Sequence, residues 1–143
     1  MSCKTWASCR SLCQWVDACG GNVPNNAVTG GEDSGEAIWV GRAEHEGNFV
    51  PGKVVPSHRV CYVPYGVREH SNHSYQVLVS PDECQPNWVA VCCGRLPPDA
   101  VQGGVTVEGE PLYIGRVSHN GTLIIGKIHG SNGCLCVAYG GSE

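Results

Sequence analysis

The sequence has little of what long helices, membrane spans and basic binding surfaces require. Its 143 residues contain one Met and one Phe, and no stretch approaches the ~20 apolar residues that cross a bilayer. No run of Lys or Arg occurs and the formal net charge is -4, which disfavours a dedicated binder of nucleic acid or of anionic membranes. Long helical periodicity of apolar residues is also missing. What is abundant is glycine, with 20 residues, which favours short strands joined by tight turns.

The N-terminus is not expected to be a signal peptide. The first residues, MSCKTWASCRSLCQWV, lack the apolar segment of about 7–15 residues that defines one. We therefore expect a cytoplasmic protein, or one exported without a conventional signal peptide. Outside the secretory pathway, the N-glycosylation sequons at Asn72 and Asn120 are interpreted as accidental.

Cysteine, by contrast, is plentiful, with ten residues. In a reducing compartment such residues are mostly buried thiols that pack as small apolar groups. In a secreted protein the same count would indicate disulfides. A zinc site is a third interpretation, but no two cysteines have the CxxC spacing typical of one. The sequence leaves these alternatives open, and we expect no metal and no other cofactor.

The two halves of the chain repeat each other. Trp15-Val16 recurs as Trp88-Val89, 73 residues later, and Gly30-Gly31 recurs as Gly103-Gly104. One inserted residue then moves the spacing to 74, at which Gly41, Arg42, His45, Gly47, Gly52, Lys53, Val63 and Tyr65 match Gly115, Arg116, His119, Gly121, Gly126, Lys127, Val137 and Tyr139. We expect a single domain over residues 1–143, in which repeats 15–80 and 88–143 are related by a pseudo-two-fold axis and share one core.

The repeats differ at their ends. Repeat 1 continues into the alternating segment SYQVLVS, residues 74–80, which reads as a strand, whereas repeat 2 stops at Glu143. The 14 residues before Trp15 are about as many as those between Tyr75 and Trp88. We therefore predict that residues 1–14, around Trp6, supply the strand that completes repeat 2, so that the repeats interlock.

Each repeat contains a predicted hairpin. AIWVGRAEH and PLYIGRVSH alternate in polarity and precede the turn dipeptides Glu46-Gly47 and Asn120-Gly121. With a two-residue loop, position 40 faces 53 and position 42 faces 51. The glycines at 41 and 52 then face each other, which indicates that a bulky neighbouring group packs closely against the hairpin there. One face of the hairpin then carries Arg42, Glu44 and Lys53, and the other carries Trp39, Ala43 and His45.

A polar cluster is expected beside this hairpin. The segment GGNVPNNAVTGGEDSGEA, residues 20–37, reads as a loop that brings Asp33 towards it. Together with Lys53, Arg42, Glu44 and the amide of Asn22, this carboxylate suits a neutral polyol, because Asp accepts from adjacent hydroxyls while Lys and Asn donate to their oxygens. The alternative is a set of surface ion pairs, each of small energy. No nucleophile elbow, zinc-protease motif or phosphate loop occurs, so we do not expect an enzyme.

These residues resemble a known family. The pattern W-V…G-x-V-P…A-V-x-G-G…[WY]-[VI]-G-R…H-x-G…G-K, present twice, is similar to the DM9 motif, which occurs in tandem in small invertebrate proteins. The resemblance implies an all-β, antiparallel, β-sandwich-like domain of two interlocked repeats, often dimeric. Some members, notably in oysters, are mannose-binding lectins that act as pattern-recognition proteins in innate immunity. In such lectins the acidic residue after Gly-Gly and the lysine of Gly-Lys hold the sugar, and here these are Asp33 and Lys53.

Repeat 2 departs from that pattern. It keeps Arg116 and Lys127, but Thr106 stands where Asp33 would fall, with Glu108 nearby. The resemblance therefore implies a principal site in repeat 1 and a second, weaker site at Lys127, Arg116 and Glu108. We predict a homodimeric lectin for mannose-containing glycans on microbial surfaces. The alternative is a protein-interaction module of the same family that binds no sugar.

Overall fold

The computed structural model describes residues 4–8, 13–65, 68–80, 87–90, 101–119, 122–129 and 135–136. Within these ranges the chain consists of antiparallel strands, turns and one 3-10 turn, Pro56–His58, so the predicted all-β class is confirmed. This part of the chain holds no helix long and apolar enough to cross a bilayer.

The strands belong to two halves of the chain. The first half contains β2 (Gln14–Cys19), β3 (Thr29–Asp33), β4 (Glu36–His45), β5 (Asn48–Val55), β6 (Val60–Tyr65), β7 (Arg68–Asn72) and β8 (Ser74–Val79). The second contains β9 (Asn87–Ala90), β10 (Gln102–Val105), β11 (Pro111–His119), β12 (Thr122–His129) and β13 (Leu135–Cys136), and β1 (Lys4–Ser8) precedes both.

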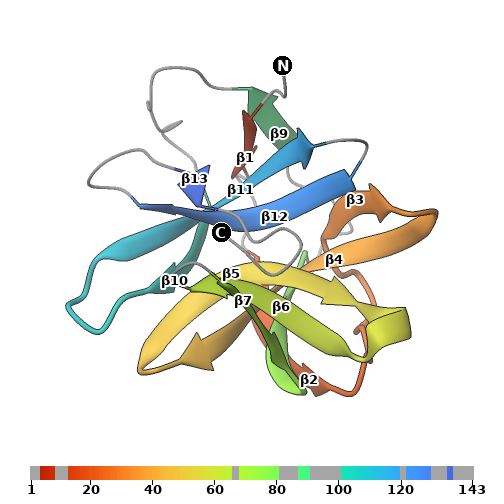
Figure 1. The fold of residues 1–143 in the computed structure, drawn as a ribbon, viewed down its shortest axis with the longest axis horizontal. Helices are drawn as coiled ribbons and strands as arrows, with labels where there is room; N and C mark the ends of the chain where they lie inside the picture. The colour runs from red at the N-terminus through yellow and green to blue at the C-terminus, as the bar shows by residue number, and fades with distance from the viewer. Residues whose placement is uncertain are drawn as a thin grey trace.

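The strands form one continuous hydrogen-bonded sheet. Its main path is β13-β12-β11-β10-β5-β4-β8-β2, with β3 added to β4, β6 to β5 and β7 to β6. The halves join where Val105 of β10 pairs with Phe49 of β5. The sheet bends at this junction so that β12 also lies against β5 and β3 (Figure 1).

The first-repeat hairpin has the predicted register. Glu46-Gly47 forms a two-residue loop in which both residues have positive φ, 50° and 84°, as a type I′ turn requires. Val40 accordingly faces Lys53, and Arg42 faces Pro51. The turn at Asn120-Gly121 in repeat 2 lies outside the described residues, although β11 and β12 pair in the equivalent register.

The segment predicted as a loop before this hairpin is partly a strand. Thr29–Asp33 forms β3, which pairs with β4 through a tight turn at Ser34-Gly35, where φ is 54° and 80°. Because glycine weakens strands, the Gly-Gly pair made this segment look like a loop in the sequence. Gly30 is needed because β3 packs tightly against β12: a Cβ at this position would lie 2.0 Å from Cδ1 of Ile125.

Strand β1 has the same pairing in the second half that β8 has in the first. In the first half, Val77 of β8 pairs with Val16 of β2 and Gly41 of β4; in the second, Trp6 of β1 pairs with Val89 of β9 and Gly115 of β11. Val89 and Gly115 are the repeat counterparts of Val16 and Gly41. Figure 1 shows β1 beside β9 and β11. In the second half β1 therefore has the place that β8 has in the first half, between β2 and β4.

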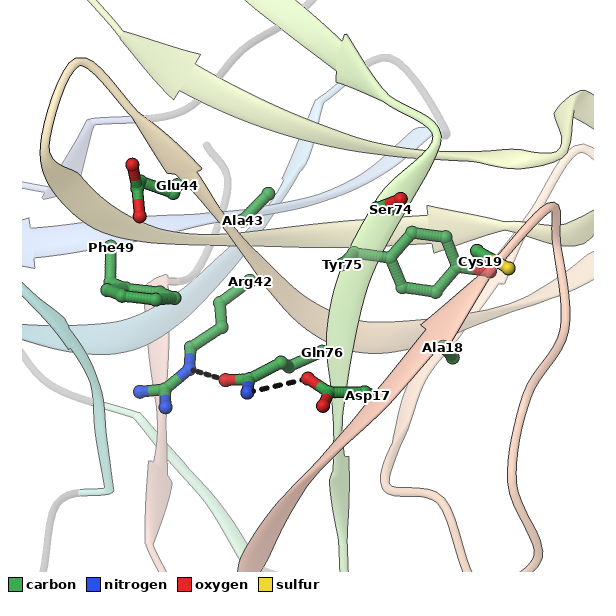
Figure 2. Close-up of a pocket in the computed structure, with 10 residues that line it drawn as sticks. All are labelled: Asp17, Ala18, Cys19, Arg42, Ala43, Glu44, Phe49, Ser74, Tyr75 and Gln76. Carbon is green, nitrogen blue, oxygen red and sulfur yellow. Dashed lines mark hydrogen bonds between the residues drawn. The ribbon is translucent and has the colours of Figure 1, made fainter.

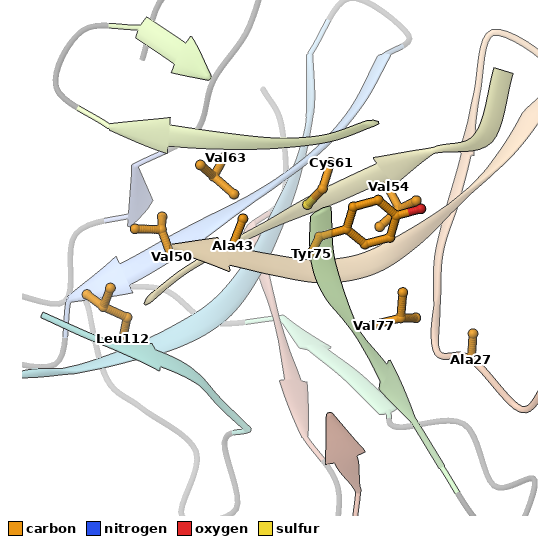
Figure 3. Close-up of a cluster of buried hydrophobic side chains, with 9 residues drawn as sticks. All are labelled: Ala27, Ala43, Val50, Val54, Cys61, Val63, Tyr75, Val77 and Leu112. Carbon is orange, nitrogen blue, oxygen red and sulfur yellow. The ribbon is translucent and has the colours of Figure 1, made fainter. Parts of the chain in front are cut away.

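Alternating residues of the central strands form two buried clusters. The first contains Ala27, Ala43, Val50, Val54, Cys61, Val63, Tyr75, Val77 and Leu112 (Figure 3). The second contains Val28, Ile38, Val40, Val55, Leu78, Ile114 and Ile125. Both clusters draw residues from both halves, so neither half buries its apolar faces alone. Each Val, Leu or Ile buried in this way contributes about 1.5–3 kcal/mol.

The paired glycines of the hairpin make room for different neighbours. A Cβ on Gly52 would lie 1.9 Å from the carbonyl oxygen of Tyr62, and one on Gly41 would lie 2.7 Å from Cγ2 of Val54. The bulky group expected at Gly52 is therefore the main chain of β6. Because a main-chain atom cannot rotate away, this position requires glycine.

Candidate functional site

Asp33 and Lys53 meet at one edge of the first repeat. Asp33 is the last residue of β3, and Lys53 lies on β5, so the Ser34-Gly35 turn brings the carboxylate over the hairpin. The Lys53 Nζ lies 3.5 Å from the Asp33 Oδ2, and the two side chains are 12% and 16% exposed. The other carboxylate oxygen, Oδ1, accepts from the Ser34 hydroxyl at 3.3 Å. The predicted carboxylate–lysine pair therefore exists, partly buried but open to solvent.

A second carboxylate and an aromatic ring flank this pair. Glu36 is the backbone pairing partner of Asp33, and Tyr62 is that of Lys53. Glu36 accepts hydrogen bonds from the Ser57 hydroxyl at 2.6 Å and from its main-chain N–H at 2.8 Å, and these bonds lower the pKa of the Glu36 carboxyl. Tyr62 Oη is 2.8 Å from His58 Nδ1, and burial, followed by the charge of Glu69, raises the pKa of Tyr62.

Sequence reasoning did not predict these neighbours. Tyr62 reaches Lys53 through the β5–β6 pairing, whose register depends on the 3-10 turn Pro56–His58. The Pro56-Ser57 dipeptide was the available turn signal, but it does not fix how many residues the connection contains.

Arg42 and Glu44 line a different pocket. This open pocket of about 490 Å³ is drawn in Figure 2, and neither Asp33 nor Lys53 is among its lining residues. The Arg42 Nε donates to the Gln76 Oε1 at 2.8 Å, and the Gln76 amide donates in turn to Asp17 at 2.9 Å (Figure 2). The structure therefore does not bring Arg42 and Glu44 together with the Asp33–Lys53 pair.

The Arg42 guanidinium also lies close to two aromatic rings. Its Cζ lies 4.4 Å from the centre of the Trp15 ring and 4.9 Å from that of Phe49. These separations are within the range of cation–π contacts. Desolvation by burial lowers the pKa of Arg42. A guanidinium held in this way serves packing between β2, β4 and β5.

The arginines of the two repeats each bind the opposite repeat. Arg42 donates to the Gly103 carbonyl at 3.5 Å, and Arg116 donates to the Gly30 carbonyl at 2.9 Å. Gly103 is the repeat counterpart of Gly30, so the exchange is reciprocal. Burial lowers the pKa of Arg116 as well. The shared Gly-Arg motif therefore links the repeats, which accounts for its presence in both.

Asn22 lies in the turn that follows β2. Its side chain is exposed and has no hydrogen-bond partner among the described residues, while its carbonyl accepts from the Tyr75 hydroxyl at 2.9 Å. Within the described ranges, no hydrogen bond or ion pair joins Asn22 to the Asp33–Lys53 pair.

Repeat 2 differs from repeat 1 at the tip of the equivalent hairpin. Thr106 occupies the place of Asp33, and the loop to Glu110 contains one more residue than Ser34-Gly35. The Thr106 hydroxyl accepts from the Glu110 N–H at 3.0 Å, which closes this longer loop, and Glu108 is exposed on it. The side chain of Lys127 lies outside the described residues. The predicted second site is thus without a carboxylate at the position of Asp33.

The Asp33–Lys53 site is suited to binding. Its carboxylate accepts hydrogen bonds, its ammonium donates them, and Tyr62 adds an aromatic surface. Among the described residues, no three His, Cys, Asp or Glu side chains gather in a metal-binding arrangement.

Comparison with known proteins gives a family match. A search of curated proteins gives no match. The family model described as DM9 repeat matches residues 32–143, which include Asp33, the Gly-Arg motifs of both halves and both Gly-Lys motifs. Because that match covers most of the chain, the protein belongs to the DM9-repeat family.

Proposed function

We propose that this protein is a lectin that binds mannose-type glycans at Asp33 and Lys53 and serves innate immunity as a pattern-recognition protein. The observation that carries the proposal is the pairing of these two side chains, 3.5 Å apart and 12–16% exposed, at the edge of repeat 1. It binds sugar without chemical turnover. It acts in the cytoplasm or after export by a route that needs no signal peptide.

The geometry of the pair favours a ligand rich in hydroxyls. A charge-assisted N–H···O bond is usually about 2.7–2.9 Å long, so a 3.5 Å separation leaves both groups with capacity for further partners. A carboxylate accepts from two vicinal hydroxyls at once, while the ammonium donates to their oxygens. Because both side chains are largely shielded from water, bonds to a ligand are worth more here than on an open surface.

Self-association follows from the same proposal. A shallow sugar site with a millimolar Kd supplies only about -4 kcal/mol. Pairing two sites raises avidity on a repetitive microbial surface by roughly 10²–10⁴-fold. We therefore propose a two-fold homodimer, the commonest closed assembly. Sedimentation at tens of micromolar measures this directly, and a monomer under those conditions would contradict the dimer.

Titration of methyl α-mannoside, followed by NMR, tests the site. Asp33→Asn and Lys53→Met each keep the shape of the side chain and remove its charge. Each lost charge-assisted bond costs about 1.5–3 kcal/mol, so affinity should fall roughly 10–100-fold. The matched control is Glu32→Gln, which removes the same charge from the exposed neighbouring residue and should leave the affinity unchanged.

Lys127→Met separates the two repeats. Because Thr106 stands in place of the carboxylate, this variant should lose less affinity than Lys53→Met. Equal losses would mean that both repeats bind sugar. Unchanged binding in Asp33→Asn would remove the proposed site, and failure of the wild type to bind any saccharide would favour a protein-interaction module.

A further inference from the structure

A second hollow lies on the face of the β3–β4 hairpin opposite to that of Asp33. Trp39 contributes to it from β4, Thr29 from β3, and Asn25 and Asn26 from the preceding loop, with Val23 and Pro24 completing much of the wall. Its volume is about 530 Å³, and none of the described residues that line it is charged. It is distinct from the pocket of Figure 2 and from the Asp33–Lys53 pair.

Three residues that line this hollow have side-chain polar groups without a partner within the described part of the chain. These groups are the indole N–H of Trp39 and the side-chain amides of Asn25 and Asn26. The Trp39 ring is partly exposed where it packs at the margin of the first buried cluster, and both asparagines are exposed. The hollow thus combines an aromatic surface with an indole N–H that can donate to a ligand and with amides that can both donate and accept.

The loop that carries the asparagines is fixed before any ligand arrives. The Tyr75 hydroxyl accepts from the Gly21 N–H and donates to the Asn22 carbonyl, both at 2.9 Å. Further along, the Ser80 N–H donates to the Asn26 carbonyl at 2.9 Å, and Ala27 bridges to β8. A preformed hollow avoids much of the entropy cost of ordering a loop on binding.

From these features we propose that the Trp39 hollow binds a neutral pyranose unit. An aromatic ring covers the C–H face of a sugar, and neutral amides bond to its hydroxyls. The lack of charged lining residues disfavours phosphates, carboxylates and amines, because a charge transferred to such a site would have no partner. The ligand class is therefore an uncharged hexose within a glycan.

This hollow is separate from the Asp33–Lys53 site. On β3, Thr29 pairs with Trp39 of β4, and Asp33 pairs with Glu36 of β4. Thr29 and Asp33 are four residues apart, which corresponds to about 13 Å of strand. Trp39 packs on the first buried cluster. Ile38, which shares a face of β4 with Glu36, lies in the second buried cluster. The proposal therefore does not depend on sugar binding at Asp33, and each site can fail independently.

The indole N–H signals in a ¹H–¹⁵N correlation spectrum provide the test. The chain has four tryptophans, and the missing signal in Trp39→Phe assigns that of Trp39. Methyl glycosides of mannose, glucose and galactose are titrated to tens of millimolar, above the millimolar Kd of a shallow site. We expect a saturable shift of the Trp39 signal with at least one of them, unchanged in Asp33→Asn.

A variant that spares the core completes the test. Asn25→Ala with Asn26→Gly removes both amides, and glycine suits position 26, where φ is 63°. Its affinity at the Trp39 signal should fall at least about 5-fold, since each neutral hydrogen bond contributes roughly 0.5–1.5 kcal/mol. No shift of the Trp39 signal with any glycoside would overturn the proposal, as would its loss in Asp33→Asn, which would make the two sites one. A Trp39 shift without any effect of Asp33→Asn on mannose binding would retain this proposal and discard the Asp33–Lys53 site.

Discussion

Gly30→Ala tests how closely the two repeats pack. Gly30 is buried on β3, and its φ lies outside the left-handed region, so the backbone accepts alanine. The new Cβ would, however, lie 2.0 Å from Cδ1 and 3.1 Å from Cγ1 of Ile125 in the other repeat. Either the Ile125 side chain changes rotamer in a filled core, or β3 and β12 move apart and strain the 2.9 Å bond from Arg116 to the Gly30 carbonyl.

Overpacking of this kind costs about 1–3 kcal/mol. For a chain of this length, each kcal/mol lowers Tm by roughly 4 °C. Urea unfolding followed by circular dichroism should therefore show a lower midpoint for Gly30→Ala with an unchanged m-value. An m-value change would instead indicate that the repeats no longer unfold together.

A double mutant identifies the cause. Ile125→Val removes Cδ1, the atom in conflict, and alone costs about 0.5–1.5 kcal/mol. Combined with Gly30→Ala it should restore about 1–2 kcal/mol relative to the sum of the single changes. The control is Gly103→Ala, whose Cβ would meet Ile114 Cγ1 at 2.7 Å and Pro51 Cβ at 2.8 Å, so Ile125→Val should give it no relief. Additive losses in the Gly30→Ala double mutant would refute the contact.

Three further outcomes follow from the structure. Tyr75→Phe leaves the Gly21 N–H and the Asn22 carbonyl without their 2.9 Å partner, so urea unfolding should show a loss of about 1–3 kcal/mol; an unchanged midpoint would contradict this role. The Ser57 bonds lower the pKa of Glu36, so their stabilisation is present above the ordinary value of 4.5 and is lost as pH falls through the lowered pKa. The urea midpoints of wild type and Glu36→Gln should therefore converge as the pH is lowered below 4.5, and a difference that stays constant would argue against a role for these bonds. Burial raises the pKa of the Cys61 thiol, so iodoacetamide at pH 8 should label the exposed Cys19 in the native protein and Cys61 only after unfolding, as read by peptide mass spectrometry.

Local signals in the sequence predicted the hairpin correctly. The alternating residues and the Glu46-Gly47 dipeptide were sufficient to pair Val40 with Lys53, because a two-residue turn fixes the register of both strands. The duplication then identified Thr106 as the repeat counterpart of Asp33. The structure places the residue that is inserted in repeat 2 in the loop after Thr106.

Contacts between distant strands were not predictable in the same way. The sequence predicts a loop at Thr29–Asp33, yet this segment is a strand, and its Gly30 fits against Ile125 of β12. Arg42 reads as a ligand-binding cation, yet it stacks on Trp15 and bonds to Gln76. In both cases the deciding partner lies far along the chain, and its position depends on how the whole sheet bends.

Strand β1 has a consequence for how the protein is made. Thr5 pairs with Ala90 and Arg116, so the last of its partners is synthesised about 110 residues after it. At ribosomal rates of about 5–20 residues per second, the edge of β1 that pairs with β11 stays unpaired for roughly 5–20 s. During that interval it is an exposed edge, open to pairing with a neighbouring nascent chain. Slow codons between residues 90 and 116 would lengthen this interval and lower the soluble yield. Chaperones that bind extended segments would raise the soluble yield.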